Sequence, residues 1–222
     1  MTSTLKRHSI TLVIVAGALF AFAPAAQAHT LTCHGHAATI VGTPGADVLV
    51  GTPGADVIVA RGGADVVRGE GGNDILCGGA GHDQLNGGSG ADQLYGGKGA
   101  DDEQGGLGDD TVSGGDGSDD LQGNDGADTI LGGSGDDNEQ GGQGNDDEQG
   151  DAGSDTLSGG ADDDQLSGGI GADELDGGTG NDDLQGDDGN DDLQGDTGDD
   201  TLSGGTGDDA LDGGTGNDDS QQ

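Results

Sequence analysis

The chain has 222 residues, of which 54 are glycine, and only two Phe and one Tyr supply aromatic side chains, with no tryptophan. So few large apolar side chains exclude the core of an ordinary globular domain. The formal net charge of −40 excludes nucleic acid and anionic membrane surfaces as direct partners, because like charges repel.

The first 28 residues have the pattern of a secretory signal peptide. Lys6 and Arg7 precede an apolar run over residues 10–22, and an Ala-Gln-Ala cleavage site ends at Ala28. The run is shorter than the roughly 20 residues that a membrane-spanning helix needs. We therefore predict a secreted, extracellular protein with no direct insertion into a membrane. Cleavage would leave 3 basic against 45 acidic residues, and 3 − 45 gives a net charge of −42.

Residues 29–41 are predicted to be an N-terminal cap. Ile40 has the position of an inward-facing strand residue, and four outward valines of the following repeats need a cover: Val48, Val50, Val57 and Val59. The ends of repetitive folds usually require such a cap. Cys33 and Cys77 would reach an oxidising compartment, so we expect a disulfide between them.

Three histidines lie near the predicted mature N-terminus, so a transition-metal site in this segment is an alternative interpretation. They are His29, His34 and His36. Histidines in an exposed tail are more often solvated than metal-bound, and a disulfide accounts for Cys33 better than metal ligation does.

Residues 42–221 form 20 nonapeptides without insertion or deletion. The sixth position is Asp in every repeat, the first and fourth positions are Gly in all but one repeat each, and the eighth is Leu, Ile or Val in 16 of 20. Alternate strand residues face opposite sides, so we predict a glycine-rich turn followed by a three-residue strand whose eighth-position side chain points inward. Two repeats then make one coil, which predicts an all-β parallel β-roll, or β-solenoid, of about ten 18-residue coils.

Four repeats lack an aliphatic residue at the inward position and have Glu103, Glu139, Glu148 or Ser220 instead. Glu139 and Glu148 belong to the same predicted coil. Unpaired charge in a core costs several kcal/mol, so this coil is predicted to open first or to turn its glutamates outward.

The nonapeptide Gly87–Tyr95 reads GGSGADQLY and resembles the G-G-x-G-x-D-x-U-x unit of repeats-in-toxin proteins, a pattern that binds Ca²⁺. This resemblance covers about four fifths of the chain. It implies that glycine carbonyls and sixth-position carboxylates bind several Ca²⁺ ions in two rows, one along each edge of the roll. One turn offers too few oxygens for this ion, so stacked turns such as those of Asp74 and Asp92 must share sites. The implied ligands are Asp74, Asp83, Asp92, Asp101, Asp110, Asp119, Asp128, Asp137, Asp146, Asp155, Asp164, Asp173, Asp182, Asp191, Asp200, Asp209 and Asp218.

Several repeats depart from this family pattern. The second glycine is replaced by Thr43, Thr52, Arg61 and Glu70 in the opening repeats, and Asp162 replaces one fourth-position glycine. The first three departures leave the sixth-position aspartates of those repeats outside the predicted ligand set.

The pattern predicts a non-catalytic calcium-binding protein that folds when Ca²⁺ binds. A chain this acidic and poor in apolar residues stays disordered until cations neutralise it. It also has too few aromatic residues to line a catalytic pocket. The alternative is a calcium-stabilised adhesive or ice-binding surface module. Thr-Gly-Asn-Asp turns at residues 179–182 and 215–218 suggest it, although their threonine row has only three rungs. Apart from calcium ions, the expected partners are a second copy bound end to end and a cell-surface or matrix component.

Overall fold

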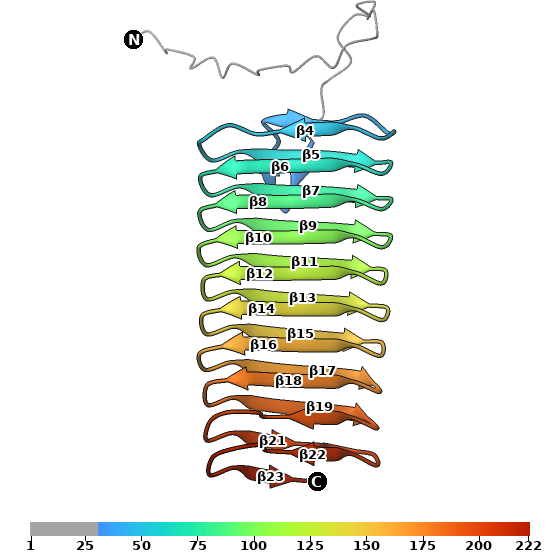
Figure 1. Cartoon of the computed structure of the whole chain (residues 1–222). Helices are drawn as coiled ribbons and strands as arrows, with labels where there is room; N and C mark the ends of the chain where they lie inside the picture. The colour runs from blue at the N-terminus through green and yellow to red at the C-terminus, as the bar shows by residue number, and fades with distance from the viewer. Residues whose placement is uncertain (1–30) are drawn as a thin grey trace, which may run out of the picture.

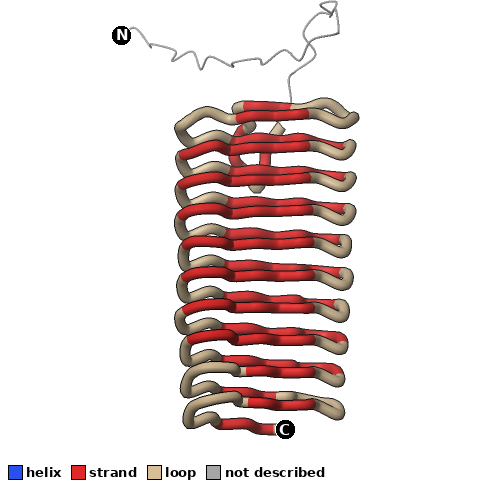
Figure 2. The backbone as a smooth tube through the Cα atoms, viewed as in Figure 1, coloured by secondary structure: helices blue, strands red, loops and turns tan. Residues whose placement is uncertain are grey.

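The structure is a computed structural model that describes residues 31–222, so the predicted signal peptide and His29 of the alternative metal site lie outside these residues. The described chain winds into an elongated roll whose strands alternate between two sheets, with the turns along both edges (Figures 1 and 2). Residues 31–222 contain no helix of the length and apolarity that crossing a membrane requires.

Each sheet collects every second strand of the roll. The ten-stranded sheet contains β4 (Val48–Val50), β6 (Val66–Gly71), β8 (Gln84–Ser89), β10 (Asp102–Leu107), β12 (Asp120–Asp125), β14 (Asn138–Gln143), β16 (Thr156–Ala161), β18 (Glu174–Thr179), β20 (Asp192–Gln194) and β22 (Ala210–Asp212). The eleven-stranded sheet contains β3 (Ile40–Val41), β5 (Val57–Gly62), β7 (Ile75–Ala80), β9 (Gln93–Lys98), β11 (Thr111–Asp116), β13 (Thr129–Ser134), β15 (Asp147–Ala152), β17 (Gln165–Gly171), β19 (Asp183–Gly189), β21 (Thr201–Ser203) and β23 (Asp219–Gln221).

Neighbouring strands in both sheets are parallel and offset by 18 residues. Leu85 of β8 is opposite Glu103 of β10, and Leu94 of β9 is opposite Val112 of β11. This register places repeats of the same kind one above another, and it confirms the predicted parallel β-roll of about ten 18-residue coils.

The strands are longer than the sequence analysis predicts. Those from β5 to β19 have six or seven residues rather than three, because each continues into the first glycines of the next repeat. In β9, Leu94 and Gly96 are both buried, while Gln93 and Lys98 are exposed. The first-position glycine therefore lies inside a strand and faces the core.

The apolar core consists of two separate stacks. One runs from Leu49 to Ile130 and the other from Leu157 to Leu202. Between them lies the coil of β14 and β15, in which Glu139 and Glu148 face inward with 1% and 0% of their surfaces exposed. The strands of this coil keep their six residues, so the outward turn offered as one expectation for these glutamates does not occur.

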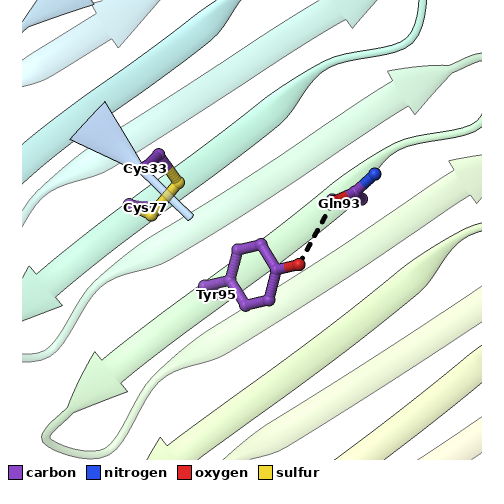
Figure 3. The surroundings of a disulfide bond; sticks show 4 residues. All are labelled: Cys33, Cys77, Gln93 and Tyr95. Atoms are coloured by element: carbon purple, nitrogen blue, oxygen red, sulfur yellow. Dashed lines mark hydrogen bonds between the residues drawn. A yellow bond between two sulfur atoms is a disulfide. The ribbon is translucent and has the colours of Figure 1, made fainter. Parts of the chain in front are cut away.

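A small antiparallel hairpin of β1 (Thr32–Cys33) and β2 (His36–Ala37) covers the first coils of the eleven-stranded sheet. A disulfide joins Cys33 to Cys77, with 5.9 Å between their Cα atoms, and Tyr95 lies beside it (Figure 3). The hydroxyl of Tyr95 donates a hydrogen bond to Gln93 Oε1, and the ring of His34 stacks on the tyrosine ring at 3.6 Å between centroids.

This cap covers one sheet only. Val59 is buried together with Cys33 and Ile75, and Val57 packs against the same cluster. Val48 and Val50 lie on the other sheet and are 54% and 39% exposed, so the prediction that the cap covers all four valines is wrong for these two. The reason is the disulfide, which holds the hairpin against β7.

Candidate metal centre

The sixth-position aspartates lie at the start of the strands, along the two edges of the roll. Asp92 directly precedes β9, and Asp83 directly precedes β8 in the facing sheet. Because consecutive strands run in opposite directions, their starting ends lie at opposite edges (Figure 1). The 18-residue register therefore builds two straight rows of aspartates from a single chain.

Each sixth-position aspartate from Asp65 onward accepts a hydrogen bond from the backbone of the aspartate one coil earlier. The N–H of Asp74 donates to Asp92 Oδ1 at 2.8 Å, and the N–H of Asp92 donates to Asp110 Oδ1 at 2.7 Å. This contact occurs 18 times, nine times along each edge, from the Asp47–Asp65 pair to the Asp200–Asp218 pair. The contact fixes one carboxylate oxygen and aims the other toward the interior.

The second oxygen, Oδ2, is buried and has no hydrogen-bond partner in 16 repeats. These are Asp65, Asp74, Asp83, Asp92, Asp101, Asp110, Asp119, Asp128, Asp137, Asp146, Asp155, Asp164, Asp173, Asp182, Asp191 and Asp200. Buried polar atoms in folded proteins nearly always have a partner. A row of orphaned carboxylate oxygens therefore fits a bound cation.

Backbone carbonyls converge on the same carboxylates. A Cβ added to Gly87 would meet Asp92 Oδ2 at 2.5 Å and the carbonyl oxygen of Gly105, one coil further, at 2.7 Å. A Cβ on the fourth-position Gly198 would overlap the carbonyl oxygen of Gly180, one coil earlier, and would meet Asp200 Oδ1 at 2.9 Å. In stacked coils the first and fourth positions therefore favour glycine, because oxygens of the neighbouring coil and of the aspartate occupy the space of a side chain. The fourth-position glycines of the opening coil, Gly45 and Gly54, would meet no atom closer than 4.0 Å.

The charge of these carboxylates is not balanced by basic side chains. Within residues 31–222 the one side-chain ion pair joins Lys98 to Asp116 on the surface. Burial raises the pKa of Asp110 to about 7, and the N–H of Asp92 offsets only part of this effect. Burial likewise raises the pKa of Asp155 to about 7. The rows consequently need an external cation to hold their negative charge at neutral pH.

The donor set is oxygen-only and rich in carbonyls. Among residues 31–222, no three His, Cys, Asp or Glu side chains come together as a metal site, so side chains alone do not complete one. Ca²⁺ takes roughly six to eight oxygen ligands, and backbone carbonyls are common among them. Zn²⁺ instead prefers nitrogen and sulfur ligands in a tetrahedral arrangement.

The family comparison agrees with this chemistry. The model of the RTX calcium-binding nonapeptide repeat matches residues 41–76, 75–103, 104–139, 113–148, 149–184 and 185–219. The chain belongs to this family. Its RTX repeats bind Ca²⁺ at multiple sites. No curated protein matches the sequence.

The predicted ligands of the RTX array differ in burial along the roll. The fifteen from Asp74 to Asp200 are buried and have an unpartnered Oδ2. Asp209 is half-buried, and Asp218 is exposed at the last turn, where Oδ1 still accepts the N–H of Asp200 at 3.2 Å. The rows are therefore most complete in the middle of the roll.

The opening RTX repeats differ from one another in a way that the sequence analysis missed. In the second repeat, Thr52 donates to Asp56 Oδ2 from its backbone N–H at 2.7 Å and from its hydroxyl at 2.9 Å, so this oxygen has partners. Asp65 has no such partner and is buried like the predicted ligands, although Arg61 replaces the second glycine of its repeat. The residue that replaces the second glycine could have indicated this difference. A threonine hydroxyl at this position can donate a hydrogen bond to the aspartate, whereas the arginine side chain is exposed.

Proposed function

We propose that this RTX protein is a secreted, extracellular and non-catalytic protein whose roll folds when Ca²⁺ binds between its stacked turns. The observation that carries the proposal is the double row of buried, unpartnered Asp Oδ2 atoms. Each row needs positive charge that the chain's own side chains do not supply. In chelator the same carboxylates repel one another, and the thin apolar core is too small to offset that repulsion.

Each ion is proposed to lie between two turns that are consecutive along one edge. The carboxylates of Asp74 and Asp92 are one such pair, and those of Asp83 and Asp101 are another. Carbonyl oxygens of the glycines at these turns complete the ligand set. The 18 stacked aspartate contacts set the upper limit of such shared sites, with the threonine-bound Asp47 and Asp56 turns the least suited.

The test is far-ultraviolet circular dichroism of the chain without residues 1–28, recorded in chelator and in millimolar Ca²⁺. We expect disorder in chelator and a β-rich spectrum in calcium, with Mg²⁺ much less effective because it demands a tighter octahedral site. Native mass spectrometry then counts the bound ions. Identical β-rich spectra in both conditions, or three or fewer ions per chain, would overturn the proposal.

The far end of the roll supports end-to-end contact as a second proposal. β22 and β23 are the last strands of their sheets, so each leaves one edge without a neighbour among the described residues. Unpaired strand edges favour association with another chain. Light scattering in calcium tests this: a wild-type dimer that becomes a monomer when Pro replaces Ser220 supports it, and a monomeric wild-type chain contradicts it.

A further inference from the structure

Three glutamates occupy inward positions that are aliphatic in most repeats. Glu103 in β10, Glu139 in β14 and Glu148 in β15 are at most 1% exposed, and no hydrogen bond of ordinary geometry reaches their oxygens, although the backbone of Gly132 approaches Glu139 and that of Gly141 approaches Glu148. Leaving a carboxylate buried and unpaired is among the costliest arrangements in a protein. The strands that hold them are nevertheless regular, with the same length and register as their neighbours. The roll is therefore built to accept a carboxylate at these positions.

All three glutamates aim one oxygen at the aspartate of their own repeat. A Cβ on Gly132 would lie 2.5 Å from Glu139 Oε1, 2.7 Å from Asp137 Oδ2 and 3.0 Å from the Gly150 carbonyl oxygen. The Glu139 and Asp137 oxygens are therefore no more than about 5 Å apart, on the side of Gly132 where a side chain is missing. Two oxygens at this separation can both bind one Ca²⁺ ion, which lies about 2.3–2.6 Å from each of its ligands.

The same convergence occurs at the other two glutamates. A Cβ on Gly141 would collide with Asp146 Oδ2 and would lie 2.7 Å from Glu148 Oε1. A Cβ on Gly96 would lie 2.5 Å from Asp101 Oδ2 and 2.6 Å from Glu103 Oε1. Because Glu139 and Glu148 reach opposite edges of one coil, each edge of that coil gains a second carboxylate.

We propose that Glu103, Glu139 and Glu148 are inward Ca²⁺ ligands, each adding a second side-chain carboxylate to the site at the aspartate of its own repeat. The inference rests on the proposed calcium binding at the turns and deepens it. The number of charged ligands tunes calcium affinity, and burial strengthens each electrostatic contact. These three turns therefore form a tight class of sites within a longer array of weaker ones.

The alternative is that the glutamates are uncharged fillers of the core. The two possibilities predict opposite signs for glutamine substitutions, which keep the shape and remove the charge. If the glutamate is a ligand, glutamine weakens calcium binding. If it is a filler, glutamine relieves a buried acid and makes folding require less calcium.

The experiment uses isothermal titration calorimetry of Ca²⁺ into the calcium-free chain and native mass spectrometry at increasing Ca²⁺, on the wild type and on E139Q/E148Q. We expect three tight ions in the wild type and one in the variant, with the calcium midpoint of folding raised at least about threefold. The matched control E174Q/D183N removes the same charge from exposed strand positions and should keep all three tightly bound ions. A midpoint for E139Q/E148Q equal to or below that of the control overturns the inference.

Two further measurements keep the test decisive. E103Q removes one glutamate from a coil whose partner is Val112, and it should retain two tight ions even if the double variant fails to fold. Limited proteolysis during stepwise chelation should cut residues 138–149 after the neighbouring coils have opened, whereas first cuts there would contradict the inference. A wild-type chain that binds no calcium would instead refute the proposed function itself, so the two failures are distinct.

Discussion

Replacing Asp92 with alanine is expected to weaken calcium binding on both sides of its turn. The substitution removes Oδ1, which accepts the N–H of Asp74 at 2.8 Å, and it removes the unpartnered Oδ2. A buried N–H left without a partner costs about 1–3 kcal/mol, or on the order of 5- to 150-fold in the folding equilibrium constant. The loss of a carboxylate from two shared sites adds to this cost, so the calcium midpoint should rise and the ion count should fall by one or two.

Asparagine at the same position separates these two effects. D92N keeps an oxygen that accepts the N–H of Asp74 but carries no charge, so it should lose the ions while keeping that hydrogen bond. Hydrogen exchange at saturating calcium is the local measurement: the Asp74 amide should exchange faster in D92A and stay protected in D92N. Native mass spectrometry counts the ions in both variants. The control is Gln93→Ala, because Gln93 is exposed and points outward. An ion count in D92A equal to that of the control, or an Asp74 amide that remains protected in D92A, would refute the shared-site reasoning.

Two further substitutions test the glycine positions and the cap. Gly87→Ala places a Cβ 2.5 Å from Asp92 Oδ2 and should raise the calcium midpoint of folding measured by circular dichroism. The control Gly45→Ala adds a Cβ that meets nothing within 4 Å and should leave this midpoint unchanged. Equal midpoints for the two variants would contradict the packing argument. The double variant C33S/C77S opens a loop with a sequence separation of 44, which is expected to cost about 4 kcal/mol and to expose Tyr95. Tyrosine fluorescence during thermal unfolding measures the effect, and an unchanged transition would show that packing alone holds the cap.

The repeat period made most of the fold predictable. An aliphatic residue two places after every aspartate fixes which strand residue faces inward, and the 18-residue coil follows from two such faces. The role of the first glycine was not predictable in this way. Gly87 is confined by Asp92 of its own repeat and by Gly105 of the next coil, and the second contact exists only once the coils have stacked.

The nine-residue period does not determine the backbone conformation at Arg61, the sheet that the cap covers or the surroundings of the inward glutamates. Arg61 adopts a left-handed backbone with φ of 89°, which leaves the carboxylate of Asp65 in the same setting as in later repeats. The hairpin covers one sheet because Cys77 lies there, and nothing in the valine pattern indicated which sheet it would choose. The inward glutamates looked like defects because their aspartate neighbours become visible only in three dimensions.

The aspartate hydrogen bonds give the roll a direction. In all 18 contacts the donor lies one coil nearer the N-terminus than the acceptor, so every coil awaits an oxygen from the part of the chain that follows it. A roll that folded in chain order would therefore complete the hydrogen bonds of each coil only when the next coil had stacked on it.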